Sequence, residues 1–236
     1  MINEFSRFEM LVGTQSVEKL KRCHIAVFGL GGVGSFTVEA LARCGVGELT
    51  LIDNDTISVT NINRQIFALH STIGEKKTHV AMERVLDINP NCVVNIIDEF
   101  YLPENADNFF NLKYDYVIDA IDTVTSKLDL AVRCYQNRIP LISCMGTGNK
   151  LDASLFEICD INKTMTCPLC RVMRRELKER GVPRLKVVYS PEPVITPQSC
   201  GCEEDSGKRQ TPASVSFVPP VAGMLLAGEA VRDLIV

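Results

Sequence analysis

A glycine-rich turn between an apolar strand and a helix constrains the fold of this chain more than any other feature. Residues 24–29 (HIAVFG) have the apolar, β-branched content of a buried strand, and residues 35–44 (SFTVEALARC) have helical character. Between them, residues 29–34 (GLGGVG) permit a tight turn and a close approach to phosphate at a helix N-terminus. The alternative role for these glycines is close packing of helix on sheet. We predict that Gly29, Gly31, Gly32 and Gly34 hold nucleotide phosphates.

Strands and helices alternate through the first 150 residues. Further strands are expected at 48–53, 92–97, 116–122 and 140–144, with helices at 74–87 and 126–137 and a helical stretch at 104–111. This alternation predicts an α/β fold with a doubly wound, mostly parallel, Rossmann-like sheet. The pattern then becomes irregular, with a strand near 155–158, a charged helix at 169–180 and a closing apolar helix. We expect a nucleotide-binding core over 1–150 and a C-terminal extension over 151–236 that packs on it as a single domain.

Composition excludes several classes of protein. The hydrophobic content of 46% supports a sizeable core, and the net charge of −4 means that any bound nucleic acid would need a local basic patch. No apolar run is long enough to span a membrane, and the N-terminus (MINEFSRFEM) lacks the pattern of a signal peptide. We therefore expect a cytoplasmic protein that makes no membrane contact and keeps its cysteines reduced.

Charged residues beyond the turn indicate which nucleotide binds. Asp53 ends the second strand, where an acidic group accepts a ribose hydroxyl; with the turn alone it would favour a dinucleotide. Arg64 (in TNINRQ) and Lys77 (in GEKK) add two cations suited to a triphosphate, although each by itself could be a surface side chain. Asp122, at the end of VIDAID, could hold magnesium between phosphates, whereas Asp119 in the same strand is equally well explained as a structural acceptor.

Four motifs in order (GLGGVGS, LIDNDTISVTNINRQ, GEKK and VIDAID) resemble the adenylating domain of the ubiquitin-activating-enzyme superfamily over about residues 7–148. Within it, NINRQI, VIDAID and RRELKERG (174–181) are most similar to the tRNA threonylcarbamoyladenosine dehydratases. The resemblance implies an ATP-binding adenylation core. It also implies an enzyme that dehydrates, and so cyclises, threonylcarbamoyladenosine beside the tRNA anticodon through a carboxyl adenylate.

The resemblance further implies roles for individual residues. Arg64, Lys77 and Asp122 would act in catalysis, the last through magnesium. Arg7 would reach from one subunit of a homodimer into the partner's site. A sulfur-relay protein is a further candidate partner, but residues 208–216 (KRQTPASVS) lack the cysteine that a persulfide would need. The nucleotide would be contacted by Gly29, Gly31, Gly32, Gly34, Asp53, Asp55, Asn61, Asn63, Arg64, Gln65, Lys77 and Asp122.

Four of the ten cysteines are paired by their spacing. Cys167 and Cys170 form a CxxC pair, which is the usual half of a zinc site because two thiolates in a short turn can face one tetrahedral metal ion. Cys200 and Cys202 form a less usual CxC pair. We predict that these four thiolates bind a structural zinc ion that staples the C-terminal extension. A redox dithiol and a sulfur-carrying persulfide are the alternatives.

A basic segment follows the CxxC pair, and its cations could contact tRNA phosphates or simply form a solvated helix face. For the chain as a whole, three alternatives stay open: an adenylating activator of a ubiquitin-like sulfur-carrier protein, a nicotinamide-dependent oxidoreductase, and a non-catalytic nucleotide-binding module. The cations of the segment are Arg171, Arg174, Arg175, Lys178, Arg180, Arg184 and Lys186.

Overall fold

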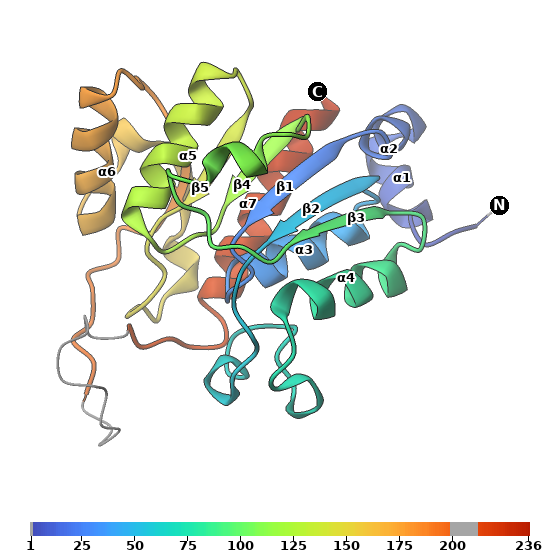
Figure 1. Ribbon diagram of the computed structural model, residues 1–236, viewed down its shortest axis with the longest axis horizontal. Helices are drawn as coiled ribbons and strands as arrows, with labels where there is room; N and C mark the ends of the chain where they lie inside the picture. Colours follow the sequence, from blue (N-terminus) through green and yellow to red (C-terminus); the bar gives the residue numbers. More distant parts are fainter. Residues whose placement is uncertain (1, 199–211) are drawn as a thin grey trace.

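The computed structural model describes residues 2–198 and 212–236, and it contains a seven-stranded sheet between layers of helices (Figure 1). The strand order is β3-β2-β1-β4-β5-β7-β6, and every pairing is parallel except that of β6 with β7. The prediction of a mostly parallel, Rossmann-like sheet is confirmed. The strands are β1 (His24–Phe28), β2 (Glu48–Ile52), β3 (Val93–Ile97), β4 (Tyr116–Asp119), β5 (Leu141–Cys144), β6 (Glu157–Asp160) and β7 (Lys186–Tyr189).

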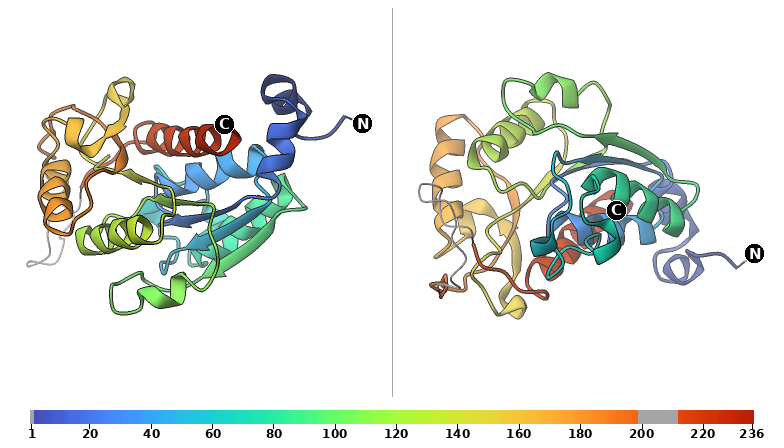
Figure 2. Two further views of the ribbon diagram at one scale, coloured as in Figure 1. Left: turned by 90° about the horizontal axis from the view of Figure 1, so that it is seen from above. Right: turned by 60° about the horizontal axis from the view of Figure 1, so that its bottom comes forward.

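Different helices cover the two faces of the sheet. Helices α3, α4 and α7 pack on one face, and α5 packs on the other with α6 beside it, toward β7 (Figure 2). The helices are α1 (Ser6–Val12), α2 (Thr14–Leu20), α3 (Gly34–Arg43), α4 (Lys77–Ile88), α5 (Val124–Gln136), α6 (Pro168–Glu179) and α7 (Pro219–Ile235).

Strand β1 is central and fully buried. Ile25 and Val27 belong to the core beneath α3 and α7, and Ala26 and Phe28 belong to the core on the opposite face. Because neighbouring residues of a strand point to opposite faces, a strand covered on both sides must be apolar throughout. The run HIAVF therefore shows no alternation of polar and apolar residues.

The C-terminal extension is more regular than the sequence indicated. β6 and β7 continue the sheet beyond β5, and α7 returns to pack on α3. Gly223 allows this close approach, since a Cβ there would lie 2.3 Å from the Val33 carbonyl oxygen. The strand expected near 155–158 forms as β6, two residues later in the chain, whereas the expectation of an irregular segment is wrong for β7. Strand β7 was missed because four residues flanked by charge give too short a pattern.

The helical stretch expected at 104–111 is shorter than predicted and forms a 3-10 helix, at Ala106–Phe109. Asn105 explains the difference. Its side chain accepts a hydrogen bond from Leu102 N at 2.9 Å and donates one to Phe100 O at 2.9 Å, and such local bonds compete with helix formation. Within residues 2–198 and 212–236, no helix has the length and apolar character needed to cross a bilayer.

Candidate nucleotide-binding site

The glycine turn joins the carboxyl end of β1 to the start of α3. Gly29 has a φ of 88°, and a Cβ there would lie 2.7 Å from the Ala120 carbonyl oxygen. A Cβ on Gly34 would lie 1.8 Å from the Gly29 carbonyl oxygen, so the fold itself requires both glycines. Gly31 differs, because its nearest neighbour would be Gln65 Nε2 at 4.0 Å. Packing therefore does not explain Gly31, whereas the approach of a ligand would.

The main chain after the turn offers hydrogen-bond donors. Leu30 N donates to Asp53 Oδ2 at 2.7 Å, and Ser35 N donates to Gly31 O at 3.0 Å. In the part of the chain that the structure describes, no hydrogen bond engages the N–H groups of Gly31, Gly32 or Val33. These groups precede the N-terminus of a ten-residue helix, where donors and the helix dipole together favour an anion.

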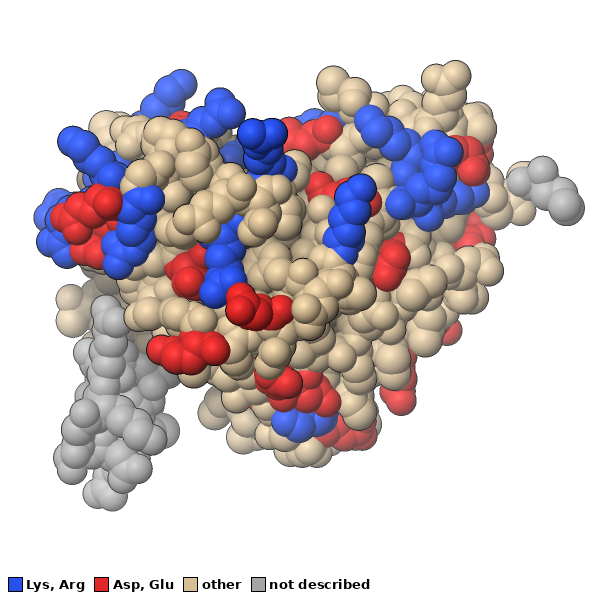
Figure 3. Space-filling view, turned by 45° about the horizontal axis from the view of Figure 1, so that its top comes forward, with Lys and Arg blue, Asp and Glu red and all other residues tan. Residues whose placement is uncertain are grey.

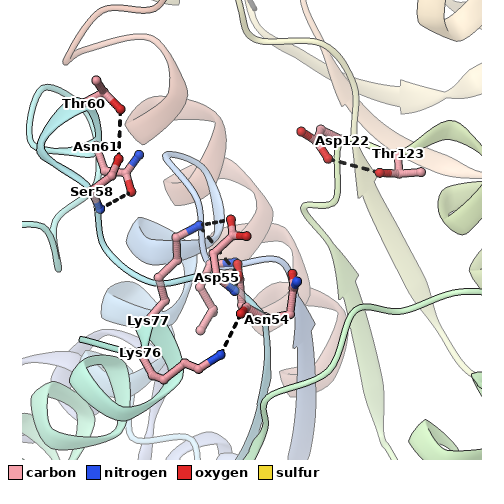
Figure 4. A network of polar contacts seen from close by, with 11 residues as sticks. Asn54, Asp55, Ser58, Thr60, Asn61, Lys76, Lys77, Asp122 and Thr123 are labelled. Atoms are coloured by element: carbon pink, nitrogen blue, oxygen red, sulfur yellow. Dashed lines mark hydrogen bonds and ion pairs between the residues drawn. The ribbon is translucent and has the colours of Figure 1, made fainter. Parts of the chain in front are cut away.

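Asp53, Asp55 and Lys77 form a network beside the turn, and Figure 4 shows the contact between Lys77 and Asp55. Asp53 Oδ1 accepts from Asp55 N at 2.9 Å and lies 3.6 Å from Lys77 Nζ, which is 2.6 Å from Asp55 Oδ2. The Lys77 side chain is only 6% exposed, whereas that of Asp55 is 59% exposed. A carboxylate has about four acceptor positions, so Asp53 can still accept a ribose hydroxyl. The predicted residues Asp53, Asp55 and Lys77 are thus brought together.

The loop after β2 brings Arg64 and Gln65 to the same turn. The Arg64 side chain packs on Gly32, where a Cβ would lie 3.1 Å from Arg64 Cγ. Arg64 Nη1 donates to Thr60 O and to Asn63 Oδ1, both at 3.0 Å. Burial lowers the pKa of the Arg64 guanidinium, which nevertheless stays protonated. A delocalised cation therefore lies next to the glycine turn.

Asn61 and Asn63 both make bonds that hold the loop. Asn61 Oδ1 accepts from Ser58 N at 3.1 Å, and Asn63 Nδ2 donates to Ser214 O at 3.0 Å. Their remaining hydrogen-bonding groups are the ones a nucleotide could use. The Asn63 contact also ties this loop to the segment that leads into α7.

Asp122 lies on the segment that follows β4, and this segment touches the glycine turn through Ala120. The Asp122 side chain is exposed, and its Oδ1 accepts only the Thr123 hydroxyl, at 3.4 Å, within the described residues. Figure 4 shows it apart from the Lys77 and Asp55 pair, with no contact drawn between them. Its carboxylate can therefore accept further ligands.

A buried ion pair that was not predicted holds the segment carrying Asp122. Lys127 Nζ lies 2.9 Å from Asp119 Oδ2 and donates to Ile121 O at 3.0 Å, and both side chains are at most 1% exposed. Asp119 also accepts from Ile121 N and from the Ser143 hydroxyl. Asp119 is thus a structural acceptor. Lys127 shares a helix face with buried residues at i+3, i+4 and i+7, and this spacing was the signal for its burial.

Arg7 is not brought to this site within one chain. It lies on α1, which α2 connects to the beginning of β1, whereas the glycine turn follows the end of β1 (Figure 1). Arg7 and the turn are therefore at opposite edges of the sheet. The structure of a single chain leaves the role of Arg7 in a partner's site as a prediction.

Cys167 and Cys170 lie at the beginning of α6, away from the nucleotide site. Both are buried, and the hydrogen bond from the Cys170 thiol lowers the pKa of Cys167. Cys200 and Cys202 lie outside the described residues. Among the residues that are described, no group of three or more His, Cys, Asp or Glu side chains is placed to hold a metal ion.

Known proteins resemble this chain along nearly its whole length. The model of the ThiF family matches residues 5–235. The tRNA threonylcarbamoyladenosine dehydratase of Bacillus subtilis is 43% identical over 243 residues, covering 100% of this chain and 96% of that protein. The enzyme of the same name from Haemophilus influenzae is 47% identical over 207 residues, covering 84% and 79%.

A solved structure agrees with these sequence matches. The crystal structure of Escherichia coli tRNA N6-threonylcarbamoyladenosine dehydratase in complex with ATP has a TM-score of 0.88 and 34% identity, covering 98% of this chain and 93% of that one. The resemblance drawn from the four motifs is thereby confirmed. This chain belongs to the ThiF family and, within it, to the family of the tRNA threonylcarbamoyladenosine dehydratases.

Proposed function

We propose that this protein uses ATP to dehydrate threonylcarbamoyladenosine in tRNA to a cyclic product. One observation carries the proposal: main-chain N–H donors, the unobstructed Gly31 and the cations Arg64 and Lys77 lie together at one edge of the sheet. The chain that holds this site is matched along its whole length by an enzyme named for that activity. Lys77 and Arg64 suit a triphosphate better than the dinucleotide of a hydride-transfer enzyme.

The chemistry needs ATP because a carboxylate is a poor electrophile whose oxygen leaves badly. The threonine carboxylate attacks the α-phosphate, the bond to the β-phosphate breaks, and pyrophosphate leaves. A nitrogen of the neighbouring ureido group then attacks the acyl carbonyl and loses its proton, and AMP departs with the electrons of the carbon–oxygen bond. The tRNA has lost one water, and no covalent enzyme intermediate is needed.

The residues of the site supply positioning and charge for this reaction. The N–H groups of Gly31, Gly32 and Val33 would cradle the phosphates, while Lys77 and Arg64 would offset the charge that develops at the α-phosphate. Such preorganised donors act without reorganisation in the transition state.

Magnesium would be held by Asp122. The Asp122 carboxylate suits this ion because it is exposed and can accept further ligands. Magnesium commonly binds one or two carboxylates together with substrate phosphates. When bound, the ion neutralises phosphate charge. The Lys127–Asp119 pair would hold Asp122 in position for that role.

Zinc would be held by Cys167 and Cys170 together with Cys200 and Cys202. The first two thiols support this proposal, because they lie within one turn and share a hydrogen bond that favours the thiolate of Cys167. Four protein ligands leave no open position on zinc, so its role would be structural and not catalytic.

A cytoplasmic homodimer would bring Arg7 to the partner's nucleotide site. Helix α1 carries Arg7 and has no buried residue. Its apolar residues Met10 and Leu11 are 86% and 85% exposed. Sedimentation analysis tests the dimer. Mixing Arg7→Ala and Lys77→Met subunits tests the shared site, because a mixed dimer would retain one intact site and regain activity. Failure to regain activity in a dimer that exchanges subunits would contradict the role of Arg7.

The function is tested by ATP–pyrophosphate exchange with threonylcarbamoyladenosine-containing tRNA, with a sulfur-carrier protein, and with neither. We expect exchange with the tRNA and a product lighter by one water. Exchange only with the sulfur carrier would identify an activator of that protein. Tight NAD binding without pyrophosphate release would identify an oxidoreductase, and ATP binding without turnover would identify a binding module.

Two adjacent lysines provide a matched pair of variants for this assay. Lys77→Met should lower the rate by about 10²–10³-fold, as the loss of one transition-state donor does in other enzymes. Lys76→Met is the control, because Lys76 Nζ donates to Asn54 O at 2.8 Å instead of facing Asp53. Equal rates for the two variants would argue against the role of Lys77.

A further inference from the structure

Helix α6 has a groove on each side, and the two grooves differ in charge. The groove shared with α5 has a volume of about 610 Å³ and is lined by charges of both signs: Asp129, Glu176 and Arg180. The groove on the other side has a volume of about 710 Å³ and is lined by four cations, with no carboxylate among the described residues that line it. We call this second groove the basic groove; its cations are Arg171, Arg174, Arg175 and Lys178.

The four cations form a stripe along one face of α6. They occupy positions i, i+3, i+4 and i+7, which share a helix face, and they extend for about 10 Å along the axis. Lys and Arg side chains gather at the end of the molecule that carries α6, at the left of Figure 3, although acidic side chains lie among them. In a protein whose net charge is −4, this is a local concentration of positive charge.

The four cations of the stripe differ in whether their side chains already have hydrogen-bond or ion-pair partners. Arg174 is half-buried, and its Nη1 donates to Thr164 O at 2.9 Å and to Ile161 O at 3.2 Å, so it holds the wall of the groove. Arg175 pairs with Glu176 at 2.7 Å. Arg174 and Arg175 are therefore already engaged by other groups of the chain.

Arg171 and Lys178 remain available for a ligand. Both are exposed, and neither makes a side-chain hydrogen bond or ion pair within residues 2–198 and 212–236. Helix α6 begins near Gly146, just beyond the carboxyl end of β5. Because the glycine turn lies at the same edge of the sheet, a long ligand along α6 would extend toward the nucleotide site.

We propose that Arg171 and Lys178 bind backbone phosphates of the tRNA substrate in the basic groove. The inference rests on the proposed function and locates the surface that receives the RNA. Regularly spaced phosphates are the ligand that a stripe of exposed cations fits, and each contact releases counterions and adds to the salt dependence of binding.

The test is the double variant Arg171→Gln/Lys178→Gln, compared with Arg22→Gln/Lys113→Gln. The control removes one exposed arginine and one exposed lysine that lie outside the basic groove. The dissociation constant for threonylcarbamoyladenosine-containing tRNA is measured by fluorescence anisotropy between 50 and 200 mM salt, a range over which phosphate contacts have large effects.

We expect the groove variant to bind tRNA about tenfold more weakly, with a salt slope reduced by about 1.4–1.8, because each lost contact lowers the slope by about 0.7–0.9. Its KM for tRNA should rise while its kcat and its affinity for ATP stay unchanged. The control variant should match the wild type in all four quantities.

The inference would be overturned if the groove variant still converts the tRNA and binds it with the affinity and salt slope of the wild type. A parallel loss of ATP affinity would also overturn it, because the residues would then act on the fold. If the wild-type protein itself does not convert the tRNA, the proposed function fails first, and that result is distinct from failure of the groove alone.

Discussion

Gly31→Ala and Gly34→Ala add the same methyl group at two places in the glycine turn, and they should have opposite effects. At Gly34 the new Cβ would lie 1.8 Å from the Gly29 carbonyl oxygen, which is main chain and cannot rotate away. At Gly31 the nearest atom would be a side-chain nitrogen at 4.0 Å, and φ is not positive. The first change therefore tests packing, and the second tests binding.

The magnitudes follow from these distances. Gly34→Ala should lower the free energy of unfolding by at least the ~1–3 kcal/mol typical of overpacking. Gly31→Ala should leave it unchanged or raise it by about 0.4–1 kcal/mol, because alanine restricts the unfolded chain. If the phosphates approach Gly31, its methyl group should weaken ATP binding at least tenfold, or by about 1.4 kcal/mol.

Urea unfolding without nucleotide gives the stabilities, and calorimetric titration with ATP gives the affinities. Gly31→Ala with wild-type affinity for ATP would refute the assignment of Gly31 to the phosphate site. A large loss of stability in Gly31→Ala would refute the reasoning differently, by showing that packing requires this glycine as well.

Three further outcomes are expected. Lys127→Met breaks the buried pair with Asp119 and should lower the free energy of unfolding by about 3–5 kcal/mol in urea, whereas exposed Lys113→Met should have little effect; equal stabilities would mean that the pair contributes nothing. Asp122→Asn removes a charge from an exposed side chain, so its stability should not change, but ATP–pyrophosphate exchange should require more magnesium; an unchanged magnesium dependence would exclude this ligand. Protein purified without a histidine tag should contain about one zinc per chain, and Cys167→Ser/Cys170→Ser should lose it, whereas metal content far below this would reject the zinc site.

Local patterns were sufficient to predict the framework of the fold. The apolar run of β1, the glycine turn and Asp53 lie within a single βαβ unit, and each depends on conformational preferences of neighbouring residues. The φ of 88° at Gly29 is one such preference, since other residues rarely adopt it. The cations Arg64 and Lys77 were predicted by motif, and the structure places both beside the turn.

Contacts between distant residues could not be predicted in this way. The antiparallel pairing of β6 with β7 depends on where the extension meets β5, and the burial of Lys127 on α5 depends on Asp119 in β4 and Ser143 in β5. Likewise, Arg174 appeared to belong with the exposed cations until its contacts with the 161–164 segment were known.

Neighbouring residues alone predict that a helix N-terminus follows a glycine turn at the end of a buried strand, because that geometry is encoded within a few adjacent positions. Which glycine is left open for a ligand depends instead on how distant segments of the chain pack around the turn. The space that a Cβ on Gly34 would need is filled by the Gly29 carbonyl oxygen, whereas the corresponding space at Gly31 is free. Conformational propensity acts along the chain, whereas the space around a Cα is set by segments that pack against it from elsewhere in the sequence.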